Sequence, residues 1–414
     1  MSEGTSKKTP GRRERRSLAQ HSSPATRIEA DDPSVAEILR AAMAVDPDDD
    51  GRRLTHGFHA WPARMHPATA ESLVATTPEN SIVLDPFMGG GTVALEALVG
   101  GRRPAGRDVN PIALEVAWTR TRHWDESQRK TLSERAGAAV ERARKLRAAK
   151  PRVPANVWST EGEWYDPPAL HEIWSLAVTL RDEKGRDPVR RALRACLSSI
   201  IVKASKQASD SVPVADRDHR FVPPKRVEGW FLGRVKELAE GMAEVADAIA
   251  DPERPDLGIL DARTTPVGLE RSVQTIITSP PYPGVYDYVA HHQRRYAAMD
   301  ASPAAARSLE IGARRDVKAH GWRDAARRFQ GDMKGVLGVW RTVLVPEGRA
   351  YVVVGDGQYP KGVIRVLPLL RKACEDAGLK WLGHAAQERA TWKIGGQSGK
   401  TGRKEYLVAL ERPR

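Results

Sequence analysis

An apolar run at residues 82–84 leads directly into a loop with few large side chains, and this pair constrains the fold more than any other part of the chain. The loop reads Asp85-Pro86-Phe87-Met88-Gly89-Gly90-Gly91-Thr92. An apolar helix is predicted over 92–100, ended by Gly100-Gly101, and a second strand is predicted over 104–109. This order predicts the opening unit of a doubly wound α/β sheet, whose ligands bind at the carboxyl ends of the strands.

The glycine cluster suits a loop that touches a small ligand. Glycines adopt backbone angles that other residues avoid and let a ligand approach the main chain. The helix that follows presents free N–H groups, which favour a carboxylate. Asp85 can order the loop or bind an amino group, and Asp108, at the end of the second strand, can accept the hydroxyls of a ribose. Taken alone, the loop also fits an NAD-binding fold or a tight turn that binds nothing.

A second junction of this kind lies far downstream. The run Thr275-Ile276-Ile277-Thr278 leads into the turn Ser279-Pro280-Pro281-Tyr282. Because the prolines withhold backbone donors, the carbonyl of Pro280 is left free to accept a hydrogen bond. A turn with two prolines is common at protein surfaces, but this one directly follows a predicted strand. We expect it to meet the glycine loop at one edge of a single sheet.

The chain divides into four parts by composition and pattern. Residues 1–32 form a polar, basic tail that is expected to be disordered. Residues 33–124 hold the glycine loop, and residues 251–414 resume the alternation of strands and helices. Between them, residues 125–250 form a helical insertion, with helices predicted at 126–149, 167–183, 187–207 and 227–249.

Composition favours a large globular protein that attracts polyanions. The 414 residues are 40% hydrophobic and carry a formal charge of +13, although part of that charge lies in the predicted tail. No apolar run approaches the roughly 20 residues that span a bilayer, and the N-terminus lacks the apolar segment of a secretory signal. The two cysteines, Cys196 and Cys374, lie far apart. We therefore expect a cytoplasmic protein without disulfide or metal site.

The two loops together resemble the DNA amino-methyltransferases, which use S-adenosylmethionine to methylate N4 of cytosine or N6 of adenine. The glycine loop is similar to that family's Asp-Pro-Phe-x-Gly-Ser-Gly-Thr, with Gly90 in place of the serine. The stretch from Gly106 to Pro111 resembles the second cofactor motif, Asp261 matches the acid that contacts adenine, and the segment from Trp61 to Arg64 resembles the motif that packs over the methionine moiety.

The resemblance implies a doubly wound, Rossmann-like methyltransferase sheet with S-adenosylmethionine as cofactor. It also implies a set of cofactor contacts in this sequence. These are Trp61, Pro62, Arg64, Asp85, Pro86, Phe87, Gly89, Gly90, Gly91, Thr92, Asp108 and Asp261.

The expected acceptor site comprises Ser279, Pro280, Pro281 and Tyr282. An exocyclic amine is a poor nucleophile because its lone pair is delocalised into the ring. The Ser279 hydroxyl and the Pro280 carbonyl can accept its hydrogens and direct the lone pair at the methyl group, while Tyr282 is expected to stack on the base. Such a base must first be flipped out of double-stranded DNA. In family terms Ser-Pro-Pro-Tyr favours N4 of cytosine over N6 of adenine.

Several alternatives stay open at this point. The same fold serves RNA amino-methyltransferases. Gly90 and the unmatched helical insertion also fit a nucleic-acid-binding protein whose catalytic domain has degenerated. The insertion can be a target-recognition region or a lid. A cognate restriction endonuclease is a possible partner, and the sequence sets neither the recognition site nor the oligomeric state.

Overall fold

The structure is a computed structural model that describes residues 27–46, 48–181, 187–210, 212–249, 254–359, 362–388 and 403–414. Most of the predicted tail lies outside the described residues, and so does most of a Gly- and Lys-rich loop that the sequence pattern predicts at 395–403. Strand β1 (Arg27–Ala30) pairs with a later strand of the main sheet, so the tail boundary predicted at residue 32 is too late.

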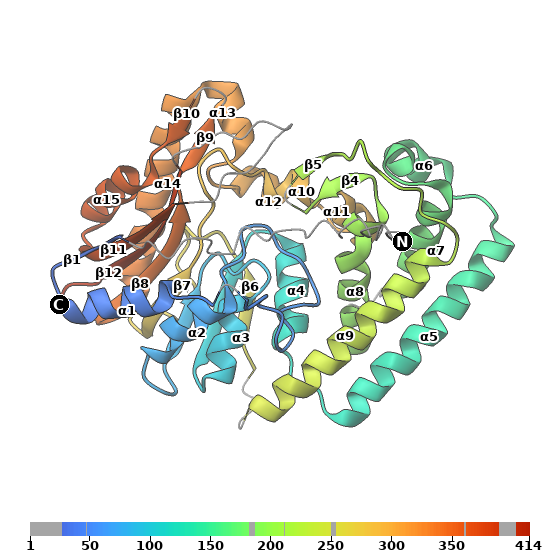
Figure 1. Ribbon diagram of the computed structural model, residues 1–414, viewed down its shortest axis with the longest axis horizontal. Helices are drawn as coiled ribbons and strands as arrows, with labels where there is room; N and C mark the ends of the chain where they lie inside the picture. The colour runs from blue at the N-terminus through green and yellow to red at the C-terminus, as the bar shows by residue number, and fades with distance from the viewer. Residues whose placement is uncertain are drawn as a thin grey trace, which may run out of the picture.

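An eight-stranded sheet forms the centre of one half of the molecule (Figure 1). Its order is β1-β11-β12-β8-β7-β2-β3-β6. The strands after β1 are β2 (Ile82–Asp85), β3 (Arg103–Asp108), β6 (Asp256–Ile259), β7 (Val273–Thr278), β8 (Leu344–Gly355), β11 (Lys380–Glu388) and β12 (Lys404–Glu411). The neighbours from β6 to β8 pair in parallel, whereas β12 is antiparallel to both of its neighbours. The predicted doubly wound, Rossmann-like α/β fold is confirmed.

The strand order reverses between β2 and β7. From β2 the chain moves outward to β3 and β6, and it then returns to place β7 and β8 on the other side of β2. The two central strands are in register, with Leu84 opposite Ile276. At their carboxyl ends the Thr278 hydroxyl donates a hydrogen bond of 2.6 Å to Asp85 Oδ1. The glycine loop and the proline turn therefore leave the same edge side by side, as predicted, at the point where open α/β sheets bind ligands.

Helices cover both faces of this sheet. Alternation of side chains along each strand sends Val83 and Ile277 to one face and Leu84 and Ile276 to the other. The first face packs against α1 (Pro33–Met43), α2 (Pro67–Ala75) and α3 (Thr92–Val99). The second packs against α14 (Trp322–Val343) and α15 (Val366–Ala377). Beside the sheet, α4 (Pro111–Thr121) packs against α3 and against the helical block.

The helical block lies beside the sheet half (Figure 1). Its long helices are α5 (Glu126–Ala149), α7 (Pro167–Leu180), α8 (Pro188–Ala204) and α9 (Arg226–Ala248), close to the predicted ranges. The sequence did not predict α6 (Ala155–Glu161), the 3-10 turn Gly162–Trp164, or the hairpin of β4 (Gln207–Ser209) and β5 (Val212–Ala215). One hydrophobic cluster joins these helices to Phe58 and to Ile112 of α4. The block therefore shares a core with the sheet half.

Four short helices connect the two halves, and the sequence predicted none of them (Figure 1). They are α10 (Tyr288–His291), α11 (Gln293–Met299), α12 (Ala304–Leu309) and α13 (Arg314–His320). A small hairpin of β9 (Gly357–Tyr359) and β10 (Gly362–Ile364) completes the elements of the described chain. Val289 and Tyr296 from this segment pack into the core of the helical block.

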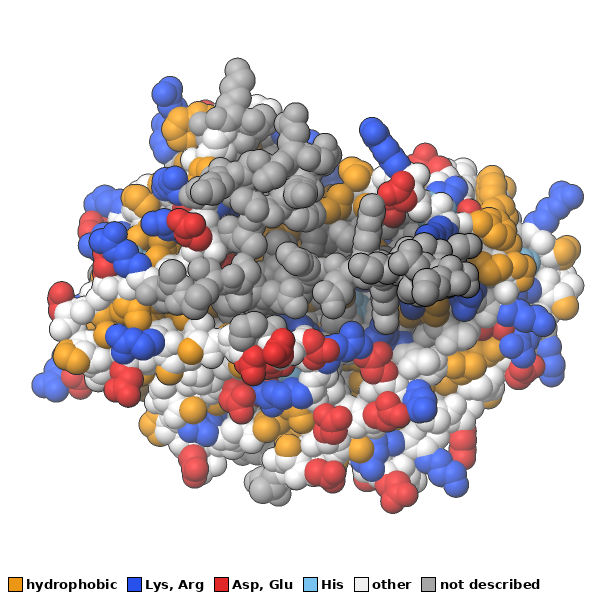
Figure 2. Space-filling model, in the orientation of Figure 1, with side chains coloured by type: hydrophobic (Ala, Val, Ile, Leu, Met, Phe, Trp, Pro, Cys, Tyr) orange, Lys and Arg blue, Asp and Glu red, His pale blue; other side chains and the backbone are white. Residues whose placement is uncertain are grey.

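The surface carries both signs of charge. On the face drawn in Figure 2, acidic and basic side chains alternate along its lower part, where α2, α3 and α9 lie. The net positive charge of the chain therefore does not gather into a single patch there. Within the described residues no helix is both long enough and apolar enough to cross a membrane.

Close packing at Gly241 holds the helical block against the segment that precedes the site. A Cβ at this position of α9 would lie 2.2 Å from the carbonyl oxygen of Leu54, whereas a Cβ at Gly233 of the same helix would meet nothing within 4 Å. We predict that Gly241→Ala lowers the free energy of unfolding by about 1–3 kcal/mol through overpacking. Gly233→Ala is the matched control and should raise it by about 0.5–1 kcal/mol, since alanine favours helix. If both variants change the free energy of unfolding equally in chemical denaturation, the close contact between Gly241 and Leu54 is contradicted.

Candidate active site

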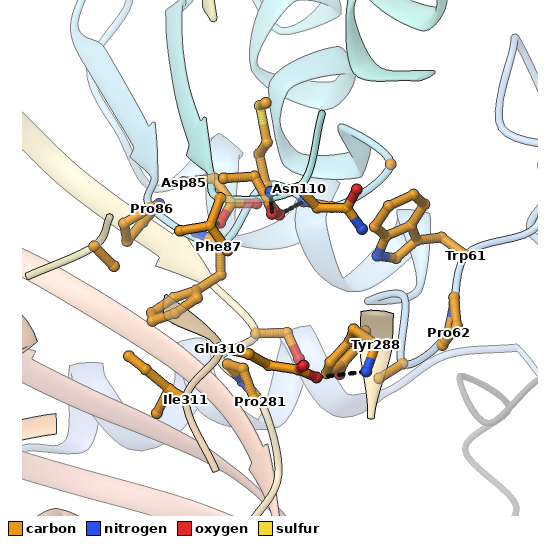
Figure 3. Close-up of a pocket in the computed structure, with 18 of the residues that line it drawn as sticks. Trp61, Pro62, Asp85, Pro86, Phe87, Asn110, Pro281, Tyr288, Glu310 and Ile311 are labelled. Carbon is orange, nitrogen blue, oxygen red and sulfur yellow. Dashed lines mark hydrogen bonds between the residues drawn. The ribbon is translucent and has the colours of Figure 1, made fainter. Parts of the chain in front are cut away.

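A cavity opens at the carboxyl edge of β2 and β7, between the two loops (Figure 3). It contains about 920 Å³ of empty space, counted out to its open mouth. All the predicted cofactor residues except Gly91 line it, from Trp61 to Asp261. Of the predicted acceptor residues, Ser279 and Pro281 line it, whereas Pro280 and Tyr282 do not.

Asp85 joins the two loops at the bottom of the site. Its Oδ1 accepts hydrogen bonds from the Thr278 hydroxyl and from the amide of Phe87, the latter at 3.1 Å. Burial raises the pKa of this carboxyl to about 7, against the effect of those two hydrogen bonds. Asp85 also lines the cavity, so it orders the loop and remains available to a ligand.

The glycines are required by what packs against them. Gly89 has a φ of +47°, and a Cβ there would lie 2.6 Å from Trp61 Nε1. A Cβ at Gly90 would lie 2.9 Å from a guanidinium nitrogen of Arg120. A serine at position 90 would therefore require the Arg120 guanidinium to shift.

Arg120 was missed by the sequence analysis. It is fully buried on α4 and donates to the carbonyls of Gly90 at 2.5 Å and His59 at 3.1 Å. Burial lowers the pKa of this guanidinium well below its ordinary value. It links the glycine loop to the segment before it, and no pattern in the sequence distinguishes it from a surface arginine on a helix.

The segment from 56 to 64 forms one wall of the cavity. Trp61 stacks on His292, with ring centroids 4.3 Å apart. Arg64 donates to the carbonyl of His56 at 2.6 Å, and His56 Nε2 lies 2.6 Å from Glu96 Oε1 on α3. Burial lowers the pKa of His56 well below its ordinary value. Trp61 and Arg64 are thus held in place at the cavity wall.

Two further acids follow β3 and β6. Asp108 Oδ2 accepts from the amide of Gly89 at 3.0 Å, and burial raises the pKa of this carboxyl to about 6. Asp261 forms an ion pair with Arg263, whose Nη2 lies 2.7 Å from Asp261 Oδ2. Burial would raise the pKa of Asp261, but the hydrogen bonds from Arg263 hold it below its ordinary value. At neutral pH Asp261 is therefore an ionised acceptor at the cavity wall.

Two hydroxyls in the cavity wall have no hydrogen-bond partner among the described residues. They are Thr92 Oγ1, in the first turn of α3, and Ser279 Oγ, at the end of β7. A buried hydroxyl without a partner costs free energy, which a polar ligand can recover. The two hydroxyls come from the two different loops, so the arrangement fits one ligand near α3 and a second beside β7.

Tyr282 differs from the expectation. Its side chain is 2% exposed, lies in the hydrophobic cluster beneath α14, and donates its hydroxyl to Glu405 Oε1 of β12 at 2.7 Å. It is a core residue in this structure and does not face the cavity. The sequence could not show this, because a strand-end tyrosine can turn either way.

A further wall of the cavity comes from the segment between α10 and α13. Tyr288, Val289, Leu309, Glu310 and Ile311 line it (Figure 3). Glu310 Oε1 accepts from the amide of Tyr288 at 2.5 Å. These residues lie in short helices and turns, where no periodic pattern marks a buried side. Among the described residues, no group of His, Cys, Asp and Glu is arranged to hold a metal ion.

Comparison with known proteins gives a short sequence match and weak structural likeness. No family model matches the chain. Over 74 residues this chain is 36% identical to the type II methyltransferase M.MvaI of Kocuria varians. The match spans 17% of this chain and 16% of that protein.

Two solved structures from Thermus thermophilus are similar over larger parts. A candidate DNA modification methylase is 21% identical with a TM-score of 0.24, covering 37% of this chain and 51% of that one. TrmN is 14% identical with a TM-score of 0.31, and the match covers 84% of this chain and 49% of TrmN. The chain thus spans about half of these two structures and a sixth of the curated relative.

The buried carboxyl of Asp85 makes stability depend on pH. The folded pKa of about 7 lies above the ordinary value of 3.8, so the protonated form stabilises the fold, and this stabilisation is lost as pH rises through about 7. In Asp85→Asn the amide oxygen still accepts from Thr278 but does not titrate. We predict that the free energy of unfolding of the variant, relative to that of wild type, rises by roughly 2–3 kcal/mol between about pH 5 and about pH 8. Chemical denaturation at the two pH values measures this change. If wild type and variant differ by the same free energy of unfolding at both, the raised pKa assigned to Asp85 is wrong.

Proposed function

We propose that this protein is an S-adenosylmethionine-dependent methyltransferase that modifies the exocyclic amine of a flipped base in double-stranded DNA, with N4 of cytosine as the acceptor. The observation that supports this best is the shared cavity. The glycine loop and the Ser-Pro-Pro-Tyr turn enclose one space, and the hydrogen bond between Thr278 and Asp85 holds them together.

The cofactor fits the half of the cavity formed by the loops after β2, β3 and β6. The amides at the start of α3 and the Thr92 hydroxyl suit its carboxylate, and Asp85 suits its amino group. Asp108 can accept the ribose hydroxyls, while Asp261 and Phe87 border the place for adenine. When bound, S-adenosylmethionine supplies an electrophilic methyl group on its sulfonium.

The acceptor amine would then lie beside β7. Ser279 Oγ has no partner among the described residues, so it can accept one amine hydrogen. Pro280 does not line the cavity in this structure, so its carbonyl would have to turn toward the amine to accept the other hydrogen. These contacts direct the lone pair toward the methyl group and hold the reactants in line. No strong base is needed before attack, because the proton leaves to water after transfer.

We propose that the helical block contacts the DNA around the flipped base. The segment after β5 is anchored by Asp166, whose Oδ2 accepts from the amide of Val222 at 2.8 Å and lies 2.9 Å from His219 Nε2. Between these anchor points Phe221 is 63% exposed and Arg220 is exposed. Basic and aromatic side chains held out in this way suit phosphates and unstacked bases.

Substitution of Ser279 tests the reaction. We predict that Ser279→Ala lowers kcat for methyl transfer from labelled S-adenosylmethionine to duplex DNA by roughly 5- to 150-fold, the equivalent of about 1–3 kcal/mol for one buried hydrogen-bond partner. Cofactor affinity should change little, since the hydroxyl faces the acceptor. Ser133→Ala is the matched control, because that hydroxyl contacts only the carbonyl of Arg129 in its own helix.

The product identifies the substrate. Mass spectrometry of the digested DNA should show N4-methylcytosine, and N6-methyladenine would move the assignment to adenine. Transfer to RNA but not to DNA would change the proposed substrate from DNA to RNA. Full transfer by Ser279→Ala would place the acceptor elsewhere.

A further inference from the structure

The base-binding part of the cavity needs a flat apolar surface that the expected tyrosine does not supply. A flipped base has lost both stacking neighbours, and an aromatic side chain replaces one of them. Tyr282 is 2% exposed and its hydroxyl is bonded to Glu405 in the core of the sheet half. For its ring to reach the cavity, it would have to leave the cluster beneath α14 and break that hydrogen bond.

Tyr288 is the tyrosine that lines the cavity together with Ser279 and Pro281. It begins α10, just past the Ser-Pro-Pro-Tyr turn. Figure 3 shows Pro281, Tyr288 and Glu310 on one side of the cavity, with Asp85 and Asn110 on the other. The side with Asp85 and Asn110 belongs to the loops after β2 and β3, which the proposed function assigns to the cofactor. Tyr288 is therefore on the acceptor side.

Tyr288 is held in place by a group of charged residues that has no other evident task. Glu310 Oε1 accepts from the backbone amide of Tyr288 at 2.5 Å, and Glu310 Oε2 pairs with Arg315 at 2.6 Å. The amide of Arg315 donates to Asp287 Oδ1 at 3.0 Å. The Glu310 side chain is 5% exposed, so its contacts are shielded from water. Two separate segments of chain are thus joined at the residue that carries the ring.

A second ring packs behind the first. Tyr286 and Tyr288 have ring centroids 5.4 Å apart and planes inclined at 47°. Tyr286 is 3% exposed, so it supports its neighbour from the core. A supported ring loses little conformational freedom when a ligand stacks on it, which favours binding.

We propose that Tyr288 is the residue on which the flipped base stacks, and that Glu310 is a positioning residue that fixes Tyr288 through its backbone. The inference rests on the proposed function, because it requires a nucleobase in the cavity. It reassigns to Tyr288 the aromatic contact that the sequence suggested for Tyr282. The hydroxyl of Tyr288 is not needed for this role, since stacking uses only the ring.

The test compares Tyr288→Ala with Tyr288→Phe in the full-length protein. Stacking of a base on an aromatic side chain is worth about 1–3 kcal/mol, so Tyr288→Ala should raise the KM for duplex DNA by about 5- to 150-fold. Tyr288→Phe keeps the ring and should stay within about 2-fold of wild type. Glu310→Ala should raise the KM for DNA with a smaller change in kcat, whereas a purely structural role would lower the melting temperature and leave KM unchanged.

A fluorescent duplex gives a readout besides turnover. With 2-aminopurine at the target position, the wild-type complex should be dim because the ring quenches the flipped base, and the Tyr288→Ala complex should be brighter. If wild type transfers no methyl group to DNA, the proposed function fails. If wild type transfers it and Tyr288→Ala keeps both its KM and its quenching, the proposed function survives and this inference is overturned.

Discussion

The hydrogen bond from Thr278 to Asp85 is the contact on which the site depends. It joins the last residues of two parallel strands that the sequence encodes far apart, at the point where the strand order reverses. The bond is buried, so loss of either partner would leave a polar group unsatisfied at a cost of about 1–3 kcal/mol. Because Ser279 follows Thr278 directly, the same bond sets the distance between the glycine loop and the acceptor hydroxyl.

Around this bond the protein arranges polar groups that would be costly elsewhere. Asp108 is half-buried and Arg120 is fully buried, and both form hydrogen bonds with backbone atoms of the glycine loop and its neighbours. They fix the loop from two sides, and the absence of side chains at Gly89 and Gly90 lets Trp61 and Arg120 come close. The loop is therefore shaped before any ligand arrives, which lowers the free energy spent on ordering it.

Much of the architecture could be predicted from the sequence because it depends on local patterns. The helix at Glu126–Ala149 was predicted with the correct bounds, since a capping residue at Asp125 and a regular apolar face mark it. The order of strand, glycine loop and helix at 82–99 was predicted because an apolar run, the glycine cluster and the Gly100-Gly101 stop mark it. The two buried cysteines lie in α8 and α15.

The rest depends on contacts between distant segments. Helices α10 to α13 are too short to show periodicity, and α14 begins at Trp322, in a polar stretch whose Phe329 is buried only by tertiary packing. Tyr282 was given a role in the site because it ends the Ser-Pro-Pro-Tyr turn, and the strand pattern does not say which way a residue beyond the strand turns. Arg120 and Glu310 were missed because each becomes part of the site only through a partner far away in the chain.

The most direct test of the account is an experimental structure of the protein with S-adenosylhomocysteine, the product of methyl transfer from the proposed cofactor. We expect its density in the cavity between Gly90 and Pro281, with the sulfur directed toward Ser279. Density on another surface of the molecule, or a bound ligand that leaves Asp85 and Asp108 without contact, would contradict the claim that the two loops form one site.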